Sequence, residues 1–202
     1  MKDSLVVLCT GGIGSGKTAV TRLFQAFGVP AYDCDRSARD LYDIDPQLCA
    51  AVAAVTGRDV LDAAGCIDRV ALAGKIFADA SLLEAVEALV HPAVIRDFEA
   101  WKARQDSPLV VIESAILLEK PLFAGLTDVT VVVISPEALR MERVMRRGLT
   151  EAQVRERMAA QWSDEARAAH ADYILENDDR TALVPAVLDI IDKTKRRWKR
   201  QI

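Results

Sequence analysis

The chain has 202 residues, 51% hydrophobic and 28% charged, with a net charge of −4 at pH 7. This size suits one α/β domain carrying an insertion, and the acidic balance argues against a general nucleic-acid-binding protein. No apolar run is long enough to cross a membrane, and four cysteines without C-x-x-C spacing indicate free thiols, so we expect a cytoplasmic protein.

The first predicted element is an apolar strand, Leu5–Cys9, that leads into a glycine-rich octapeptide and then a helix from Ala19. The octapeptide, residues 11–18, matches the phosphate-binding pattern G-x-x-x-x-G-K-[ST] at every fixed position. Its glycines can adopt positive φ, Lys17 can reach the β- and γ-phosphates, and the Thr18 hydroxyl can bind Mg²⁺. We therefore expect a nucleoside triphosphate, with Mg²⁺, to contact Gly12, Ile13, Gly14, Ser15, Gly16, Lys17, Thr18 and Ala19.

An acidic pair, Asp33 and Asp35, follows a second short strand at Val29–Tyr32. One carboxylate can hold Mg²⁺ through water, while the other can accept a proton from a substrate hydroxyl. Either aspartate could instead cap the following helix. The residues alone leave these roles open.

The stretch from 36 to 104 has no strong strand pattern and predicts several helices. Pro92 is expected to start a new helix, with His91 near its cap, because proline is favoured at a first helical turn. We interpret this insertion as a substrate-binding subdomain. One of its helices is predicted by an apolar stripe at Leu83, Val86, Val90 and Val94.

Three further apolar runs, at 109–112, 129–134 and 173–175, have the pattern of buried parallel strands. Five strands alternating with helices predict a doubly wound α/β fold of the P-loop NTPase type, a five-stranded parallel sheet flanked by helices. The carboxyl ends of parallel strands meet at one edge, so the glycine loop should lie beside Asp33, Glu113 and Ser135.

Six arginines occur between positions 140 and 157, where Gly148 and Thr150 should separate two helices. A solvated helix pair would explain this charge, but beside a triphosphate site we favour a lid over the phosphates. The basic run at 193–200 is interpreted as the solvated end of a last helix.

These motifs together resemble those of the dephospho-coenzyme A kinases, small P-loop kinases related to the nucleoside monophosphate kinases. The resemblance runs from Val6 to about Asn177 and includes the glycine loop without change. The other matching motifs are Asp33-Cys34-Asp35 with Arg39, Gly65–Leu72 with Phe77, His91-Pro92, Arg157 with Gln161, and Ala171–Asn177.

The resemblance implies that ATP phosphorylates the ribose 3′-hydroxyl of 3′-dephospho-coenzyme A, the last step of coenzyme A biosynthesis. It implies a nucleotide-binding core at 1–35, 105–139 and 162–202. The helical insertion at 36–104 would bind the coenzyme A substrate, and residues 140–161 would form the helical lid. These small molecules are the only partners we expect, with no nucleic acid or membrane, and we favour a monomer.

The resemblance also implies roles for individual residues. Asp35 would be the base, Asp33 would lie near Mg²⁺ with Thr18 and Glu113, and Asn177 would face adenine. Besides Lys17, the catalytic cations would be the lid arginines Arg143 and Arg147. The anionic substrate would be held by Asp35, Arg39, Arg69, Lys75 and His91.

Three departures from the family pattern affect this interpretation. The segment Ala115–Glu119 lacks the usual proline, the turn at Arg147-Gly148 is one residue shorter, and Arg167 replaces a common lysine. A different small-molecule or nucleoside kinase is the first alternative. A non-enzymatic nucleotide switch is the second, although the guanine-reading motif N-K-x-D is absent.

Overall fold

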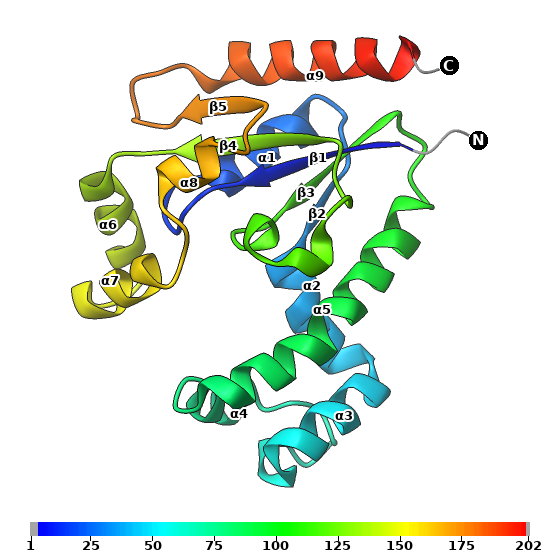
Figure 1. Cartoon of the computed structure of the whole chain (residues 1–202), viewed down its shortest axis with the longest axis vertical. Helices are drawn as coiled ribbons and strands as arrows, with labels where there is room; N and C mark the ends of the chain where they lie inside the picture. Colours follow the sequence, from blue (N-terminus) through cyan, green and yellow to red (C-terminus); the bar gives the residue numbers. More distant parts are fainter. Residues whose placement is uncertain (1–3, 201–202) are drawn as a thin grey trace. The chain divides into compact units, whose positions relative to one another are not determined.

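The computed structural model describes residues 4–200, and its contacts divide the chain into two units (Figure 1). One unit comprises the chain up to Asp33 and from Lys102 onward, and the other is Cys34–Trp101. The first contains β1 (Leu5–Thr10), α1 (Lys17–Ala26), β2 (Ala31–Asp33), β3 (Leu109–Glu113), β4 (Val129–Ile134), α6 (Glu137–Met145), α7 (Glu151–Ala159), α8 (Asp164–Ala168), β5 (Tyr173–Glu176) and α9 (Leu183–Arg200), with short 3₁₀ turns η2 (Leu117–Glu119) and η3 (Pro121–Phe123).

The five strands form one parallel sheet in the order β2-β3-β1-β4-β5, which confirms the predicted fold. Each predicted apolar run overlaps a strand, because strands covered on both faces are rich in apolar residues. Burial is almost complete in β3, β1 and β4, whereas Ile174 and Glu176 of the edge strand β5 are exposed. The strand β2 begins later than predicted, after Pro30, which has no N–H to donate to the ladder. The Pro30 carbonyl still accepts a hydrogen bond from the Val111 N–H (2.8 Å).

One face of the sheet is covered by α1 and α9, which lie side by side in Figure 1. Alternate residues of β1, including Val7, pack into the same buried cluster as Phe24 of α1 and Ile190 of α9. Burying each such side chain contributes roughly 1.5–3 kcal/mol. This packing fixes the start of α1, and with it the glycine loop between β1 and α1.

The second unit is helical, with α2 (Cys34–Ile44), α3 (Pro46–Thr56), the 3₁₀ turn η1 (Arg58–Val60), α4 (Arg69–Ile76) and most of α5 (Ala80–Lys102). The expectation that Pro92 starts a new helix was wrong, because α5 continues through it. Proline leaves the Ala88 carbonyl without its usual i+4 donor. Burial of Val90, Val94 and Phe98 around the proline offsets that loss.

The arginine-rich stretch forms two helices, α6 and α7, as predicted. Gly148 has φ 95° at the break, and Thr150 caps α7 in a capping box with Gln153. All four cysteines are free thiols, as expected. Among residues 4–200, no helix is both long and apolar enough to span a membrane.

Candidate active site

The glycine loop between β1 and α1 has the backbone that its sequence predicts. Gly14 and Gly16 adopt φ of 79° and 95°, a region that other residues rarely enter. A Cβ on Gly16 would lie 2.0 Å from Nδ2 of Asn177, and one on Gly14 would lie 2.6 Å from the Arg140 carbonyl oxygen. These glycines are required by close neighbours as well as by backbone conformation.

Lys17 and Thr18 begin α1 and bring two polar groups to the loop. The Lys17 ammonium donates to the carbonyls of Gly11 (3.1 Å) and Gly12 (3.4 Å). The Thr18 hydroxyl donates to Oε1 of Glu113 at 2.8 Å. A cation and the hydroxyl predicted to bind Mg²⁺ therefore lie at the amino end of the helix, where anions are favoured.

The predicted metal ligands Thr18, Asp33 and Glu113 meet at the carboxyl edge of the sheet. Asp33 ends β2 in register with Glu113, which ends β3. Burial raises the pKa of Glu113, hydrogen bonds from Thr18 and Thr21 oppose the rise, and the nearby Asp33 carboxylate adds to it. No cluster of three His, Cys, Asp or Glu suited to a metal occurs within residues 4–200. The oxygens of Thr18, Asp33 and Glu113 nevertheless have the chemistry that suits Mg²⁺, which keeps several waters and binds through few carboxylates plus substrate phosphates.

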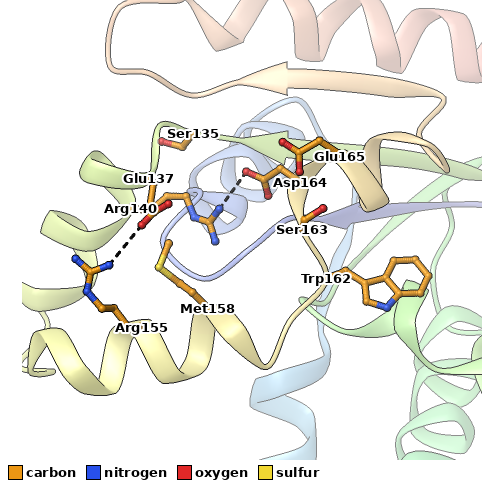
Figure 2. A pocket seen from close by; sticks show the side chains of 9 residues that line it. All are labelled: Ser135, Glu137, Arg140, Arg155, Met158, Trp162, Ser163, Asp164 and Glu165. Atoms are coloured by element: carbon orange, nitrogen blue, oxygen red, sulfur yellow. Dashed lines mark hydrogen bonds and ion pairs between the residues drawn. The ribbon is translucent and has the colours of Figure 1, made fainter.

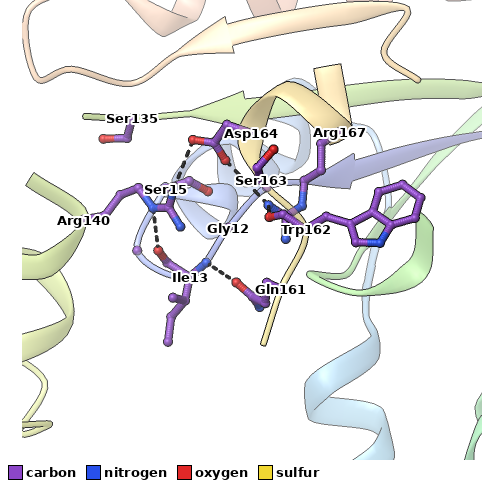
Figure 3. Close-up of polar contacts among 12 residues, drawn as sticks. Gly12, Ile13, Ser15, Ser135, Arg140, Gln161, Trp162, Ser163, Asp164 and Arg167 are labelled. Atoms are coloured by element: carbon purple, nitrogen blue, oxygen red, sulfur yellow. Dashed lines mark hydrogen bonds and ion pairs between the residues drawn. The ribbon is translucent and has the colours of Figure 1, made fainter. Parts of the chain in front are cut away.

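Two arginines one turn apart on α6 lie against the glycine loop. The Arg140 Nε donates to the Ile13 carbonyl (3.0 Å), and its Nη1 donates to Oδ2 of Asp164 (3.0 Å) (Figure 3). Arg143 donates from Nη1 to the carbonyl of Gly14 (3.3 Å) and to the Ser135 hydroxyl (3.1 Å). Arg140 was predicted only as one of the six lid arginines, although its spacing from Arg143 places both on one helix face.

Asn177, which was expected to face adenine, is buried after β5 and holds the loop. Its Nδ2 donates to the Ser15 carbonyl at 2.8 Å. Its own carbonyl accepts from Ser135 Oγ (2.8 Å) and Arg143 Nη2 (3.2 Å), and Arg143 also pairs with Asp179 (2.5 Å). The side-chain amide is thus engaged with the loop backbone, whereas adenine recognition by this residue stays a prediction.

The segment before β5 also reaches the loop. Oε1 of Gln161 accepts a hydrogen bond from the Ile13 N–H at 2.8 Å. Arg167, completely buried, donates to Oε1 of Glu119 at 2.9 Å and lies 3.6 Å from Oδ1 of Asp164. Sequence reasoning noted Gln161 only as part of a motif, and Arg167 only as a departure.

A polar cavity of about 460 Å³ lies beside Arg140, among α6, α7 and the start of α8 (Figure 2). It carries both signs of charge, and Arg155 pairs within it with Glu137 (3.8 Å). Its lining residues are Ser135, Glu137, Arg140, Arg155, Met158, Trp162, Ser163, Asp164 and Glu165.

All five predicted substrate residues belong to the second unit. Asp35 is exposed in the first turn of α2, and its carbonyl accepts from Arg39 Nε (3.0 Å). Arg69 pairs with Asp43, and Lys75 with Asp59.

Two other predicted site residues are His91, a substrate residue, and Arg147, a lid arginine. His91 is half-buried within α5, and Arg147 is exposed after α6. The part that these residues play in substrate binding and catalysis stays a prediction.

A family model and the curated relatives indicate one family, and solved structures show the same fold. A family model described as dephospho-CoA kinase matches residues 5–182. A dephospho-CoA kinase of Porphyromonas gingivalis is 40% identical over 191 residues, covering 93% of this chain and 94% of the relative. The crystal structure of TT1252 from Thermus thermophilus has a TM-score of 0.82 and 32% identity, covering 95% of this chain and 98% of that one. The dephospho-CoA kinase of Campylobacter jejuni, at 20% identity and a TM-score of 0.61, shares the fold and covers 95% and 97%.

Proposed function

Because the chain belongs to the dephospho-CoA kinase family, we propose that it transfers the γ-phosphoryl group of ATP to the ribose 3′-hydroxyl of 3′-dephospho-coenzyme A. The products are coenzyme A and ADP. The observation that carries the proposal is the meeting of Lys17, Thr18 and Glu113 at the end of the glycine loop. These groups supply what phosphoryl transfer requires, which is positioning and compensation of phosphate charge.

In the proposed ATP complex, backbone N–H groups of the loop and of the start of α1 bind the phosphate oxygens. Lys17 exchanges its hydrogen bonds with the carbonyls of Gly11 and Gly12 for bonds to the β- and γ-phosphates. Asn177 and Arg143 border the same loop from β5 and α6. Arg147, at the exposed end of α6, completes the cover when the lid helices close over the nucleotide.

We propose that Thr18 and Glu113 hold Mg²⁺, with Asp33 acting through water. When bound, Mg²⁺ neutralises charge on the phosphates and helps to align them. Thr18 and Glu113, which are now hydrogen-bonded to each other, would be the protein groups that hold the ion. Ionised Glu113 is the form required, and an adjacent cation lowers the pKa that burial raises.

The acceptor is oriented by the acidic pair. The 3′-oxygen attacks the γ-phosphorus in line, the bond to the β,γ-bridging oxygen breaks, and ADP leaves. Asp35 accepts the hydroxyl proton, and a weak base suffices because the transition state is loose. Arg39, Arg69, Lys75 and His91 supply cationic or polar groups for the anionic substrate within the helical unit, Cys34–Trp101.

We also propose that the enzyme works as a cytoplasmic monomer.

A coupled assay of ADP release tests the function, with dephospho-coenzyme A, shikimate, nucleosides or no acceptor. The proposal requires ADP release that depends on dephospho-coenzyme A. Equal release with another small alcohol would indicate a different kinase, and slow release independent of any acceptor would indicate a nucleotide switch.

A further inference from the structure

The peptide groups on both sides of Ile13 are held by side chains from distant parts of the chain. Its N–H donates to Oε1 of Gln161 at 2.8 Å, and its carbonyl accepts from Nε of Arg140 at 3.0 Å. Figure 3 shows both contacts at the outer bend of the glycine loop. Neither side chain has a role in the transfer step described above.

We propose that Gln161 and Arg140 are positioning residues that fix the peptides on either side of Ile13 and thereby aim the loop N–H groups at the nucleotide phosphates. The inference deepens the proposed function and rests on ATP binding at this loop.

The backbone at this bend is a turn whose central peptide can face two ways. The Ser15 N–H donates to the Gly12 carbonyl at 3.2 Å, and Gly14, in the third position, has φ 79°. That value is typical of a type II turn, which differs from type I mainly by rotation of the central peptide. The turn alone therefore does not decide which way the peptide between Ile13 and Gly14 faces.

Arg140 decides that orientation. In a trans peptide the carbonyl and the N–H point in opposite directions, so a donor holding the Ile13 carbonyl turns the Gly14 N–H away from itself. Gln161 acts in the same way on the preceding peptide, since binding the Ile13 N–H leaves the Gly12 carbonyl pointing the other way. That carbonyl is the one that accepts from Ser15 N–H and from Lys17 (3.4 Å).

Arg140 is itself held in one orientation. Its Nη1 donates to Asp164 (3.0 Å), and Asp164 lies 3.6 Å from the completely buried guanidinium of Arg167. Arg167 also binds Glu119 (2.9 Å), whose Oε1 accepts from the Trp162 N–H at 3.1 Å. A planar guanidinium can serve Glu119 and Asp164 together, which a lysine ammonium on a flexible stem does less well.

The test replaces Gln161 by methionine, which has a similar length but no comparable acceptor. Gln161 is half-buried, so the variant should fold. We expect exchange of the Ile13 amide proton, measured by NMR on the nucleotide-free protein, to become about 3- to 10-fold faster, the range for one lost hydrogen bond. The KM for ATP should rise by a similar factor, while kcat and the KM for dephospho-coenzyme A stay unchanged.

Two further variants serve as controls. Gln161→Glu keeps an acceptor at the same place and should retain the slow Ile13 exchange in the nucleotide-free protein. Gln25→Met alters an exposed glutamine on α1 and should change neither the exchange nor the KM for ATP.

Three outcomes with Gln161→Met overturn the inference. The first two are unchanged exchange of the Ile13 amide proton and an unchanged KM for ATP. The third is a lowered melting temperature with equally weakened binding of ATP and dephospho-coenzyme A, which indicates a structural role only. Failure of the proposed function looks different. In that case the wild-type enzyme would not phosphorylate dephospho-coenzyme A, while Gln161→Met would still weaken ATP binding and expose the Ile13 amide.

Discussion

The Thr18 hydroxyl donates a 2.8 Å hydrogen bond to Oε1 of Glu113, although 95 residues separate the two in the chain. The contact exists because β1 and β3 are neighbours in the sheet and Cys9 pairs with Glu113. A hydroxyl at the start of α1 and a carboxylate at the end of β3 thus become joint candidates for Mg²⁺.

Asp35→Asn should lower kcat at least ~100-fold, because the amide cannot accept the 3′-hydroxyl proton. Its KM for ATP should change little, since Asp35 is proposed to face the acceptor. Steady-state kinetics with varied ATP and dephospho-coenzyme A measure both effects. Asp33→Asn is the matched variant. Near-full turnover in Asp35→Asn together with a large loss of turnover in Asp33→Asn would show that Asp33, and not Asp35, is the base.

Glu113→Gln should change how stability depends on pH in the metal-free protein. Burial raises the pKa of Glu113, so the folded state keeps this proton to a higher pH than the unfolded chain does. Its contribution is complete below the ordinary pKa of glutamate and is lost as pH rises through the folded value.

The free energy of unfolding of wild type minus that of Glu113→Gln should therefore fall with rising pH. Chemical denaturation over about pH 4 to 8 measures this difference. A difference that grows with pH would mean that the folded site favours the ionised carboxylate without metal.

Gly16→Ala should abolish tight ATP binding and destabilise the protein. The new Cβ would lie 2.0 Å from Nδ2 of Asn177, at a φ of 95° that costs about 1 kcal/mol or more. Gly28→Ala is the matched control, because Gly28 has φ 77° but open space around the position of a Cβ. Thermal melting and nucleotide titration should show strain in both variants and loss of ATP binding only in Gly16→Ala. Equal ATP affinity in the two would contradict the tight fit of the loop against Asn177.

Arg167→Met should destabilise the protein by about 3–5 kcal/mol, because it leaves the Glu119 carboxylate without its cation. Arg167 is completely buried, and the Glu119 side chain is 10% exposed. Urea denaturation measures the loss. The double variant Arg167→Met/Glu119→Gln should recover part of it, since no unpaired carboxylate remains. A loss below about 1 kcal/mol in the single variant would place the pair among weak surface ion pairs.

The sheet and the loop could be predicted from sequence because each depends on a local pattern. Runs such as Val129–Ile134 are apolar apart from Thr130, as is typical of strands buried on both faces, and the loop glycines follow a fixed spacing. Pro92 was misjudged because its local preference competes with tertiary burial of α5, which sequence alone does not reveal.

The contacts of Gln161 and Arg140 could not be predicted in the same way. Their partner is the backbone of Ile13, 148 and 127 residues away, and a peptide group carries no side-chain signature. The buried Arg167–Glu119 pair could not be predicted either, since charged residues are mostly exposed and nothing in the local sequence indicates that these two are buried.

We propose that the glycine loop and the acidic residues together deliver the γ-phosphoryl group to one sugar hydroxyl. The most direct measurement is the product of the enzyme with ATP, Mg²⁺ and dephospho-coenzyme A, identified by mass spectrometry and ³¹P NMR, for wild type and Lys17→Ala. We predict coenzyme A phosphorylated at the ribose 3′-oxygen, at a rate at least ~100-fold lower in Lys17→Ala. Phosphate on another atom, or equal rates in the two proteins, would contradict the account.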